Sequence, residues 1–188
     1  AAHRASGAAC TMLTAVVANP SRYGRVVRQG EQVARIVEDL DATPDERAIH
    51  EINVGVAVSL PEGLMVPVIR QADAKHLAEI ARESRTLAQK AREGKASYDE
   101  VTGGTFTITN LGSYGIDAFT PIINPPQIGI LGVGRVIEKP VVYQGEITKR
   151  SMMFLSLTFD HRVIDGAPAA AFLRTVKDHL EDPWWMVA

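Results

Sequence analysis

The chain has 188 residues, 46% of them hydrophobic and 22% charged, which are the proportions of a globular protein with its own core. Its formal net charge of −2 argues against a nucleic-acid or anionic-membrane surface, so small molecules and other proteins are the expected partners. The single cysteine, Cys10, excludes an intrachain disulfide and a multi-cysteine metal site, and no apolar run reaches the ~20 residues of a membrane helix.

The first 48 residues carry the weakest pattern. Residues 11–17, just after Cys10, are apolar enough for part of a buried helix, and residues 39–47 form a polar loop. Between them, residues 25–38 mix valine and isoleucine with charged residues. The chain begins abruptly at Ala1, and we therefore expect residues to precede it.

From residue 51 the hydrophobic pattern sharpens. Apolar residues occupy every second position from Ile52 to Val58, which predicts a strand with one buried face. Pro61 and Gly63 predict a turn, and residues 64–69 form a second apolar strand. We expect these two strands to pair.

A helix is predicted next, capped by Asp73 and ended by Gly94. Its apolar face consists of Leu77, Ile80, Ala81, Leu87, Ala88 and Ala91. The other face is highly charged, and we interpret it as a solvated surface.

Two further strands are predicted at residues 105–109 and 128–133, on either side of a loop rich in glycine and proline. A hairpin follows, in which residues 141–143 and 146–148 flank a Gln144–Gly145 turn.

The last predicted strand, residues 152–159, is long and largely apolar. A final helix starts near Gly166, with Pro168 in its first turn. Strands and helices are mixed along the chain and do not strictly alternate. This order predicts an α+β fold, a two-layer sandwich of mixed sheet and helices.

The segment from Asp160 to Gly166 carries the clearest sign of chemistry. His161 follows a buried strand and Asp165 precedes a helix, a junction where a side chain can be held rigidly beside a cleft. Histidine takes up and returns a proton near neutral pH, which suits a general base. The alternative is a histidine of the core or an interface, paired with carboxylates.

Other kinds of site fit this sequence poorly. No other histidine stands in a ligand spacing with His161, so no metal is expected. A serine hydrolase needs a Gly-x-Ser-x-Gly turn, and Ser113 lacks the surrounding pattern. A dinucleotide fingerprint would need a third glycine after Gly132 and Gly134.

Four stretches in a fixed order carry a family resemblance. The His-x-x-x-Asp-Gly signature within residues 160–166 resembles that of acyltransferases related to chloramphenicol acetyltransferase. Three more stretches narrow the resemblance to the dihydrolipoamide acyltransferases of 2-oxoacid dehydrogenase complexes. They are GLMVPVIR at residues 63–70, GGTFTITN at residues 103–110 and PIINPPQ at residues 121–127.

The resemblance implies how the chain is organised. Residues 49–188 would be the acyltransferase catalytic core, with a fold like that of chloramphenicol acetyltransferase. Residues 1–48 match the family poorly and would be a divergent or truncated segment of the same domain. The lipoyl-lysine would be carried on a separate domain that is not in this chain.

The resemblance also implies residue roles. His161 would be the base that removes the thiol proton of coenzyme A, so that the thiolate attacks the acyl-dihydrolipoyl thioester. Thr109 would hydrogen-bond the tetrahedral oxyanion, although it could equally be an ordinary strand threonine. Asp165 would support the histidine loop with an arginine from the missing N-terminal segment, cap the last helix, or do both.

Finally, the resemblance implies substrates and partners. The acyl group is expected to be acetyl, from a pyruvate or acetoin dehydrogenase complex, because residues 115–120 resemble acetyl-handling members. The protein would be a homotrimer with His161 and Thr109 supplied by neighbouring subunits, built into a cubic or dodecahedral core. That core would work with 2-oxoacid dehydrogenase and dihydrolipoamide dehydrogenase, in the bacterial cytoplasm or the mitochondrial matrix. The alternatives are a non-catalytic core or adaptor subunit and a stand-alone acetyltransferase of the same fold.

Overall fold

The computed structural model of the protein describes residues 25–29, 32–37 and 52–186. The helix expected at residues 11–17, the polar loop at residues 39–47 and Cys10 lie outside this part of the chain. The N-terminal hairpin is antiparallel and consists of β1 (Arg25–Gln29) and β2 (Gln32–Val37).

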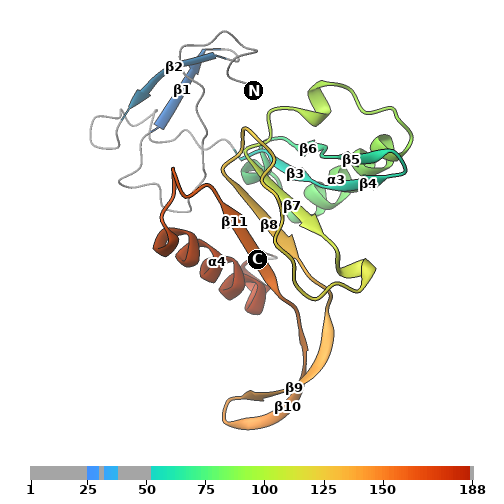
Figure 1. Cartoon of the computed structure of the whole chain (residues 1–188), viewed down its shortest axis with the longest axis vertical. Helices are drawn as coiled ribbons and strands as arrows, with labels where there is room; N and C mark the ends of the chain where they lie inside the picture. The colour runs from blue at the N-terminus through green and yellow to red at the C-terminus, as the bar shows by residue number, and fades with distance from the viewer. Residues whose placement is uncertain (1–24, 30–31, 38–51, 187–188) are drawn as a thin grey trace.

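The centre of the fold is a five-stranded sheet with the strand order β11-β8-β7-β3-β6 (Figure 1). Its strands are β3 (Val54–Val56), β6 (Val68–Ile69), β7 (Phe106–Asn110), β8 (Gly129–Val133) and β11 (Leu155–Phe159). Strand β7 runs parallel to both β3 and β8, whereas β6 and β11 are antiparallel to their neighbours. The predicted α+β class, with a mixed sheet and helices, is therefore confirmed.

The pairing predicted between the strands at residues 52–58 and 64–69 is confirmed, but each strand is split. β3 pairs with β6 in the large sheet, while β4 (Val58–Leu60) pairs with β5 (Gly63–Met65) in a separate ribbon. The expected burial pattern differs as well, because β3 lies inside the sheet between β7 and β6. Asn53 is almost completely buried there, whereas Val54 and Val56 are only half-buried.

The helix α3 (Leu77–Arg92) packs against β4 and β6. Its N-cap is His76, not Asp73 as predicted, because the carboxylate of Glu79 accepts a hydrogen bond of 2.9 Å from the His76 backbone N–H. Asp73 belongs instead to a preceding 3₁₀ turn. The helix ends next to Gly94, as predicted, and this glycine has a φ of 66°.

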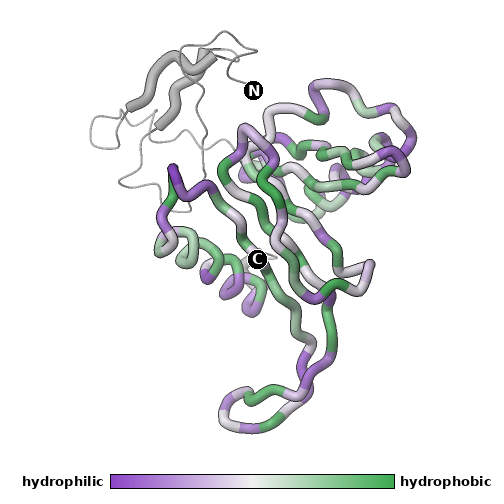
Figure 2. Tube along the Cα trace, viewed as in Figure 1, coloured by the Kyte–Doolittle hydropathy of each residue, from purple (hydrophilic) through white to green (hydrophobic). Residues whose placement is uncertain are grey.

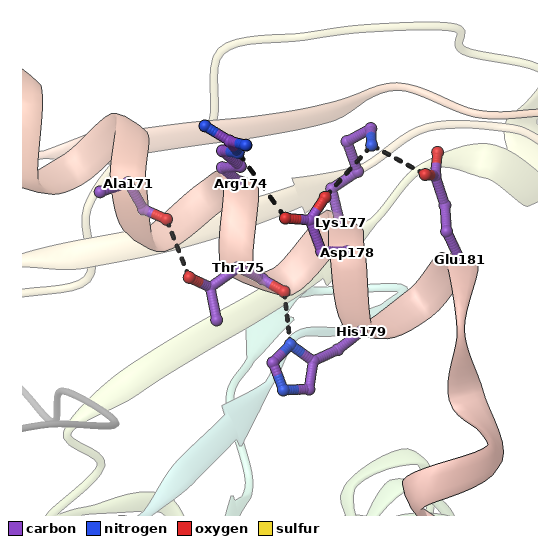
Figure 3. Close-up of polar contacts among 7 residues, drawn as sticks. All are labelled: Ala171, Arg174, Thr175, Lys177, Asp178, His179 and Glu181. Carbon is purple, nitrogen blue, oxygen red and sulfur yellow. Dashed lines mark hydrogen bonds and ion pairs between the residues drawn. The ribbon is translucent and has the colours of Figure 1, made fainter.

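The helix α4 (Gly166–Glu181) starts where predicted and packs against β11 (Figure 1). The Phe172 ring meets the Phe106 ring of β7 edge-on, with 5.7 Å between the centroids. The outer surface of α4 carries a row of polar contacts, including the ion pair of Lys177 and Glu181 at 2.8 Å (Figure 3). The less exposed residues of α4 are apolar, namely Ala169, Phe172, Leu173 and Val176, and its charged residues are exposed. Figure 2 shows hydrophobic and hydrophilic residues interspersed along this helix.

The predicted hairpin is present and longer than expected, with β9 (Ile137–Tyr143) and β10 (Glu146–Met152) extending away from the sheet (Figure 1). Gln144 and Gly145 have φ values of 52° and 85°, which a tight hairpin turn requires. The prediction of a single strand at residues 152–159 is wrong. Met152 is the last residue of β10, and two residues outside any strand separate it from the start of β11 at Leu155.

Short 3₁₀ turns complete the described chain. They are Ala72–Ala74, Asp99–Val101, Gly112–Tyr114 and Pro183–Met186. No helix among the described residues is long and apolar enough to cross a membrane.

Candidate active site

His161 lies in a tight turn directly after β11. The Asp160 backbone N–H donates to the Ile128 carbonyl at 2.8 Å, which continues the pairing of β11 with β8 by one more bond. The Asp160 carbonyl then accepts from the N–H groups of Val163 and Ile164, which closes the turn around His161. The histidine side chain is 70% exposed, and its ring centroid lies 5.5 Å from that of Phe159. The end of a strand therefore presents a solvent-accessible imidazole, and the cleft expected beside it stays a prediction.

The two residues that flank His161 are bound to each other. The guanidinium of Arg162 donates to both carboxylate oxygens of Asp160, from Nε to Oδ1 at 2.9 Å and from Nη2 to Oδ2 at 2.6 Å. These side-chain bonds, together with the bond from the Arg162 backbone N–H, lower the pKa of Asp160 to about 2. Asp160 is therefore ionised throughout the neutral pH range. This pair was not predicted from the sequence, although both residues stand inside the motif.

Asp165 is near His161 without touching it. Its Oδ1 lies 3.9 Å from His161 Nδ1, which is beyond hydrogen-bonding distance, and its side chain is 86% exposed. Asp165 occupies the N-cap position of α4, but its side chain makes no capping hydrogen bond. Within the described residues no arginine comes within ion-pair distance of Asp165, and the N-terminal segment expected to supply one lies outside them.

Thr109 lies on β7, level with Gly132 on β8 and, beyond it, Ser156 on β11. Because Gly132 has no side chain, Phe119 and Pro121 can lie close to this face of the sheet. A Cβ atom added to Gly132 would lie 3.0 Å from Cζ of Phe119 and 3.3 Å from Cδ of Pro121. The glycine- and proline-rich loop therefore covers the sheet beside Thr109. The threonine itself is half-buried.

The loop that follows Thr109 is held tightly against the end of β8. The Arg135 backbone N–H donates to the Ile116 carbonyl at 2.8 Å, and the Arg135 and Asp117 side chains form an ion pair. That hydrogen-bonded pair lowers the pKa of Asp117. The backbones approach so closely that a Cβ on Gly134 would overlap the Asp117 carbonyl oxygen. This contact was not predicted from the sequence, because its residues are far apart in the chain.

His161 and Thr109 are not brought together within one chain. Phe159 pairs with Gly129, three positions along β8 from Gly132, which pairs with Thr109. Strands rise ~3.3 Å per residue and lie ~4.8 Å apart, so the Cα atoms of Phe159 and Thr109 are ~14 Å apart. His161 lies still further along the chain from that level. Within the described chain, Asp165 therefore lies near His161, whereas Thr109 lies far from both.

The two best-formed pockets of the described residues do not include these three residues. The larger one, of about 410 Å³, lies between α3 and the turn at Asp99–Val101, and none of the three predicted site residues lines it. Its two basic groups already have partners, since Lys90 pairs with Glu100 at 2.6 Å and Arg70 donates to the Asp99 and Thr102 carbonyls. Among the described residues, no group of three or more histidine, cysteine or acidic side chains could hold a metal ion.

Comparison with known proteins adds independent information. The family model for the catalytic domain of 2-oxoacid dehydrogenases acyltransferase matches residues 26–188. The acetyltransferase component of the acetoin cleaving system of Bacillus subtilis is 54% identical over 133 residues, which are 70% of this chain and 33% of that protein. The succinyltransferase component of the 2-oxoglutarate dehydrogenase complex of Haemophilus influenzae is 47% identical over 131 residues, 70% of this chain and 32% of that protein.

Solved structures agree with these matches. The dihydrolipoamide acetyltransferase of Azotobacter vinelandii superposes with a TM-score of 0.72 at 37% identity, covering 90% of this chain and 65% of that one. A truncated catalytic core of the 2-oxoacid dehydrogenase complex of Thermoplasma acidophilum gives a TM-score of 0.67 at 38% identity, covering 87% and 67%. The chain spans about a third of the length of the curated relatives it matches.

Proposed function

The chain belongs to the 2-oxoacid dehydrogenase acyltransferase family, with the chloramphenicol-acetyltransferase-like fold of its catalytic cores, and we propose that it transfers an acetyl group from acetyl-dihydrolipoyl-lysine to coenzyme A. The relatives include acetyl- and succinyltransferases, and the acetyltransferase of the acetoin system has the higher identity of the two described above. The resemblance of residues 115–120 to acetyl-handling members favours acetyl as the acyl group. Residues 49–188 would contain the catalytic core.

One observation carries the proposal, namely the spacing of the three candidate residues. In the Azotobacter vinelandii acetyltransferase, a serine, a histidine 52 positions later and an asparagine four positions after that were studied for their role in the catalytic mechanism. Thr109, His161 and Asp165 have the same separations in this chain. Threonine keeps the hydroxyl of serine, whereas aspartate replaces the amide of asparagine by a charge.

In the proposed reaction, His161 accepts the thiol proton of coenzyme A. A thiol with a pKa of ~8.5 is only slightly ionised at neutral pH, so a base in contact with it raises the thiolate concentration where it reacts. The thiolate adds to the thioester carbonyl, and the Thr109 hydroxyl donates a hydrogen bond to the resulting oxyanion. Collapse of the tetrahedral intermediate releases the dihydrolipoyl thiolate, which recovers the proton from His161. The products are acetyl-coenzyme A and dihydrolipoyl-lysine.

The reaction so described needs two subunits. Because His161 and Thr109 are well separated within one chain, we propose a homotrimer in which the two residues meet across an interface. Large apolar side chains on the single-chain surface support further contacts, since Leu64, Ile122 and Trp184 are 68%, 88% and 75% exposed. Asp165 would then support the His161 turn from within that interface.

A larger assembly follows by analogy with the cubic core of the pyruvate dehydrogenase multienzyme complex, whose structure superposes with a TM-score of 0.72. We propose that trimers build a cubic or dodecahedral core. Its partners would be the 2-oxoacid dehydrogenase and dihydrolipoamide dehydrogenase components, in the bacterial cytoplasm or the mitochondrial matrix. Lipoyl-lysine would arrive on a domain outside this chain.

The test is an acyl-transfer assay with dihydrolipoamide and acetyl-, succinyl- or branched-chain acyl-coenzyme A, run in the reverse direction. We expect kcat/KM to be highest for the acetyl donor. Highest activity with succinyl-coenzyme A would reject acetyl as the acyl group. Absence of transfer with every donor, in a folded and assembled protein, would favour the non-catalytic core subunit instead. An active particle no larger than a single trimer would favour the stand-alone acetyltransferase.

A further inference from the structure

We propose that Asp160 and Arg162 are positioning residues for His161, acting as an ion pair that fixes the turn from which the imidazole reacts. This inference rests on the proposed function, in which His161 is the base. Neither Asp160 nor Arg162 takes part in the proposed reaction.

The need for such a device follows from the exposure of His161. Its side chain is 70% exposed, its nearest ionic neighbour among the described residues is Asp165 at 3.9 Å, and its ring centroid lies 5.5 Å from that of Phe159. Few side-chain contacts therefore restrain the imidazole, and its position depends on the main chain. An error of about 1 Å in placing a catalytic group can reduce the rate by ~100-fold.

The pair has the geometry that this task requires. Asp160 Oδ1 accepts from the Arg162 backbone N–H at 3.0 Å, which makes a local turn between the residues on either side of His161. The planar guanidinium then engages both carboxylate oxygens, a two-point contact that fixes orientation as well as distance. Both ends of the His161 residue are thus tied to one carboxylate.

The main chain of Asp160 is also anchored to the sheet. The Asp160 side chain is only 14% exposed, and its backbone N–H binds the Ile128 carbonyl beside β8. The Arg162 side chain, by contrast, is 87% exposed and makes no other ion pair in the described part of the chain. Arginine therefore closes the turn from the solvent side, while aspartate connects it to the rigid sheet.

The experiment separates the ion pair from the local turn. Arg162→Ala removes the guanidinium and keeps the backbone bond to Asp160. Asp160→Asn keeps an oxygen acceptor for that bond and removes the charge. We expect each variant to lower kcat by about 10- to 100-fold, with the KM for coenzyme A and for the acyl donor within about twofold of the wild-type value. Arg162→Lys, which keeps a charge but not the fork, should lie between Arg162→Ala and the wild type.

Two further variants supply a coupling test and a control. The double variant Asp160→Asn/Arg162→Ala should be no slower than the slower single variant, because both act through one pair. The matched control is Asp178→Asn, which breaks exposed contacts with Arg174 and Lys177 on α4 and should leave kcat unchanged (Figure 3).

A crystal structure of Arg162→Ala gives a readout independent of activity, and we expect a displaced His161 imidazole. The proposal is overturned if both single variants keep the wild-type kcat, or if the imidazole stays in place. A raised KM with unchanged kcat would instead assign Arg162 to substrate binding and also overturn it. A wild-type protein without acyl transfer would reject the proposed function, while the position of the imidazole in the variant would still test the pair.

Discussion

Thr109 and His161 lie toward opposite ends of one mixed sheet. Strand β11 is antiparallel to β8, and β8 is parallel to β7, so the end of β11 that leads to His161 is the end at which β7 begins. Thr109 stands near the other end of β7, in register with Gly132. At a rise of ~3.3 Å per residue and a strand spacing of ~4.8 Å, this arrangement alone gives ~14 Å between Thr109 and Phe159. We therefore expect one thioester to meet both groups only where two chains contribute to the site.

His161→Ala should reduce acyl transfer by at least ~100-fold, because it removes the proposed general base. The fold should be unaffected, since the side chain is mostly exposed within one chain, and we expect the assembly to persist. Steady-state kinetics and light scattering measure the two effects. His179→Ala is a suitable control, because His179 lies on the exposed face of α4 with its Nδ1 2.7 Å from the Thr175 carbonyl (Figure 3). More than about a tenth of the wild-type activity in His161→Ala would reject His161 as the base.

Thr109→Ala should lower kcat by on the order of 100-fold while the KM for coenzyme A changes little. A hydrogen bond to the oxyanion exists mainly in the transition state, and its loss has this kinetic signature. Thr109→Ser keeps the hydroxyl and should stay close to the wild type, which separates loss of the donor from loss of strand packing. A higher KM at constant kcat would mean that Thr109 binds substrate.

Much of this fold could be predicted where the signal is local. Gln144 and Gly145 mark the hairpin turn and Gly94 ends α3, because these positions require a positive φ. The start of α4 at Gly166 was also predicted. The break after Met152 was missed, because an apolar run does not reveal where a chain leaves one sheet and enters another.

Contacts between distant segments could not be predicted in the same way. Asn53 is buried because it binds the Gly103 carbonyl and the Gln71 backbone N–H, and Thr107 is buried because it donates to Gln127 at 2.6 Å. Hydrophobic periodicity predicts the burial of apolar residues and cannot predict that polar residues like these are buried. The candidate site shows the same limit, since the motif located His161, but its distance from Thr109 depends on strand order and direction.

The Asp160–Arg162 pair should contribute to stability in a pH-dependent way. The pKa of Asp160 is about 2 in the folded protein, against ~3.9 for an unperturbed aspartate. A carboxyl whose pKa is lowered by folding stabilises fully above its unfolded pKa, and this contribution is lost as pH falls from ~4 toward ~2. Urea unfolding of wild type and Asp160→Asn should show a constant difference in unfolding free energy above pH ~5 that shrinks below pH ~4. A difference that persists unchanged at pH 2.5 would show that the charge is not its source.

Mixing two inactive variants tests directly whether the site is shared between subunits. The His161→Ala and Thr109→Ala proteins are dissociated and reassembled together in equal amounts. The resulting trimers contain interfaces between like variants and interfaces between unlike variants. If one subunit supplies His161 and its neighbour supplies Thr109, random assembly leaves about a quarter of the interfaces with both residues intact. Activity should then recover to about a quarter of the wild-type level.

The control for this recovery is His161→Ala mixed with the double variant Thr109→Ala/His161→Ala. No interface in that mixture contains an intact His161, so no activity should return, whichever subunits pair. Co-assembly is verified by mass spectrometry of the intact trimers, with one variant carrying an affinity tag. If mixed trimers form and the first mixture still stays inactive, both residues must act within one subunit. The separation of Thr109 from His161 in the sheet would then have to close by a rearrangement of the chain, and the two-subunit site would be wrong.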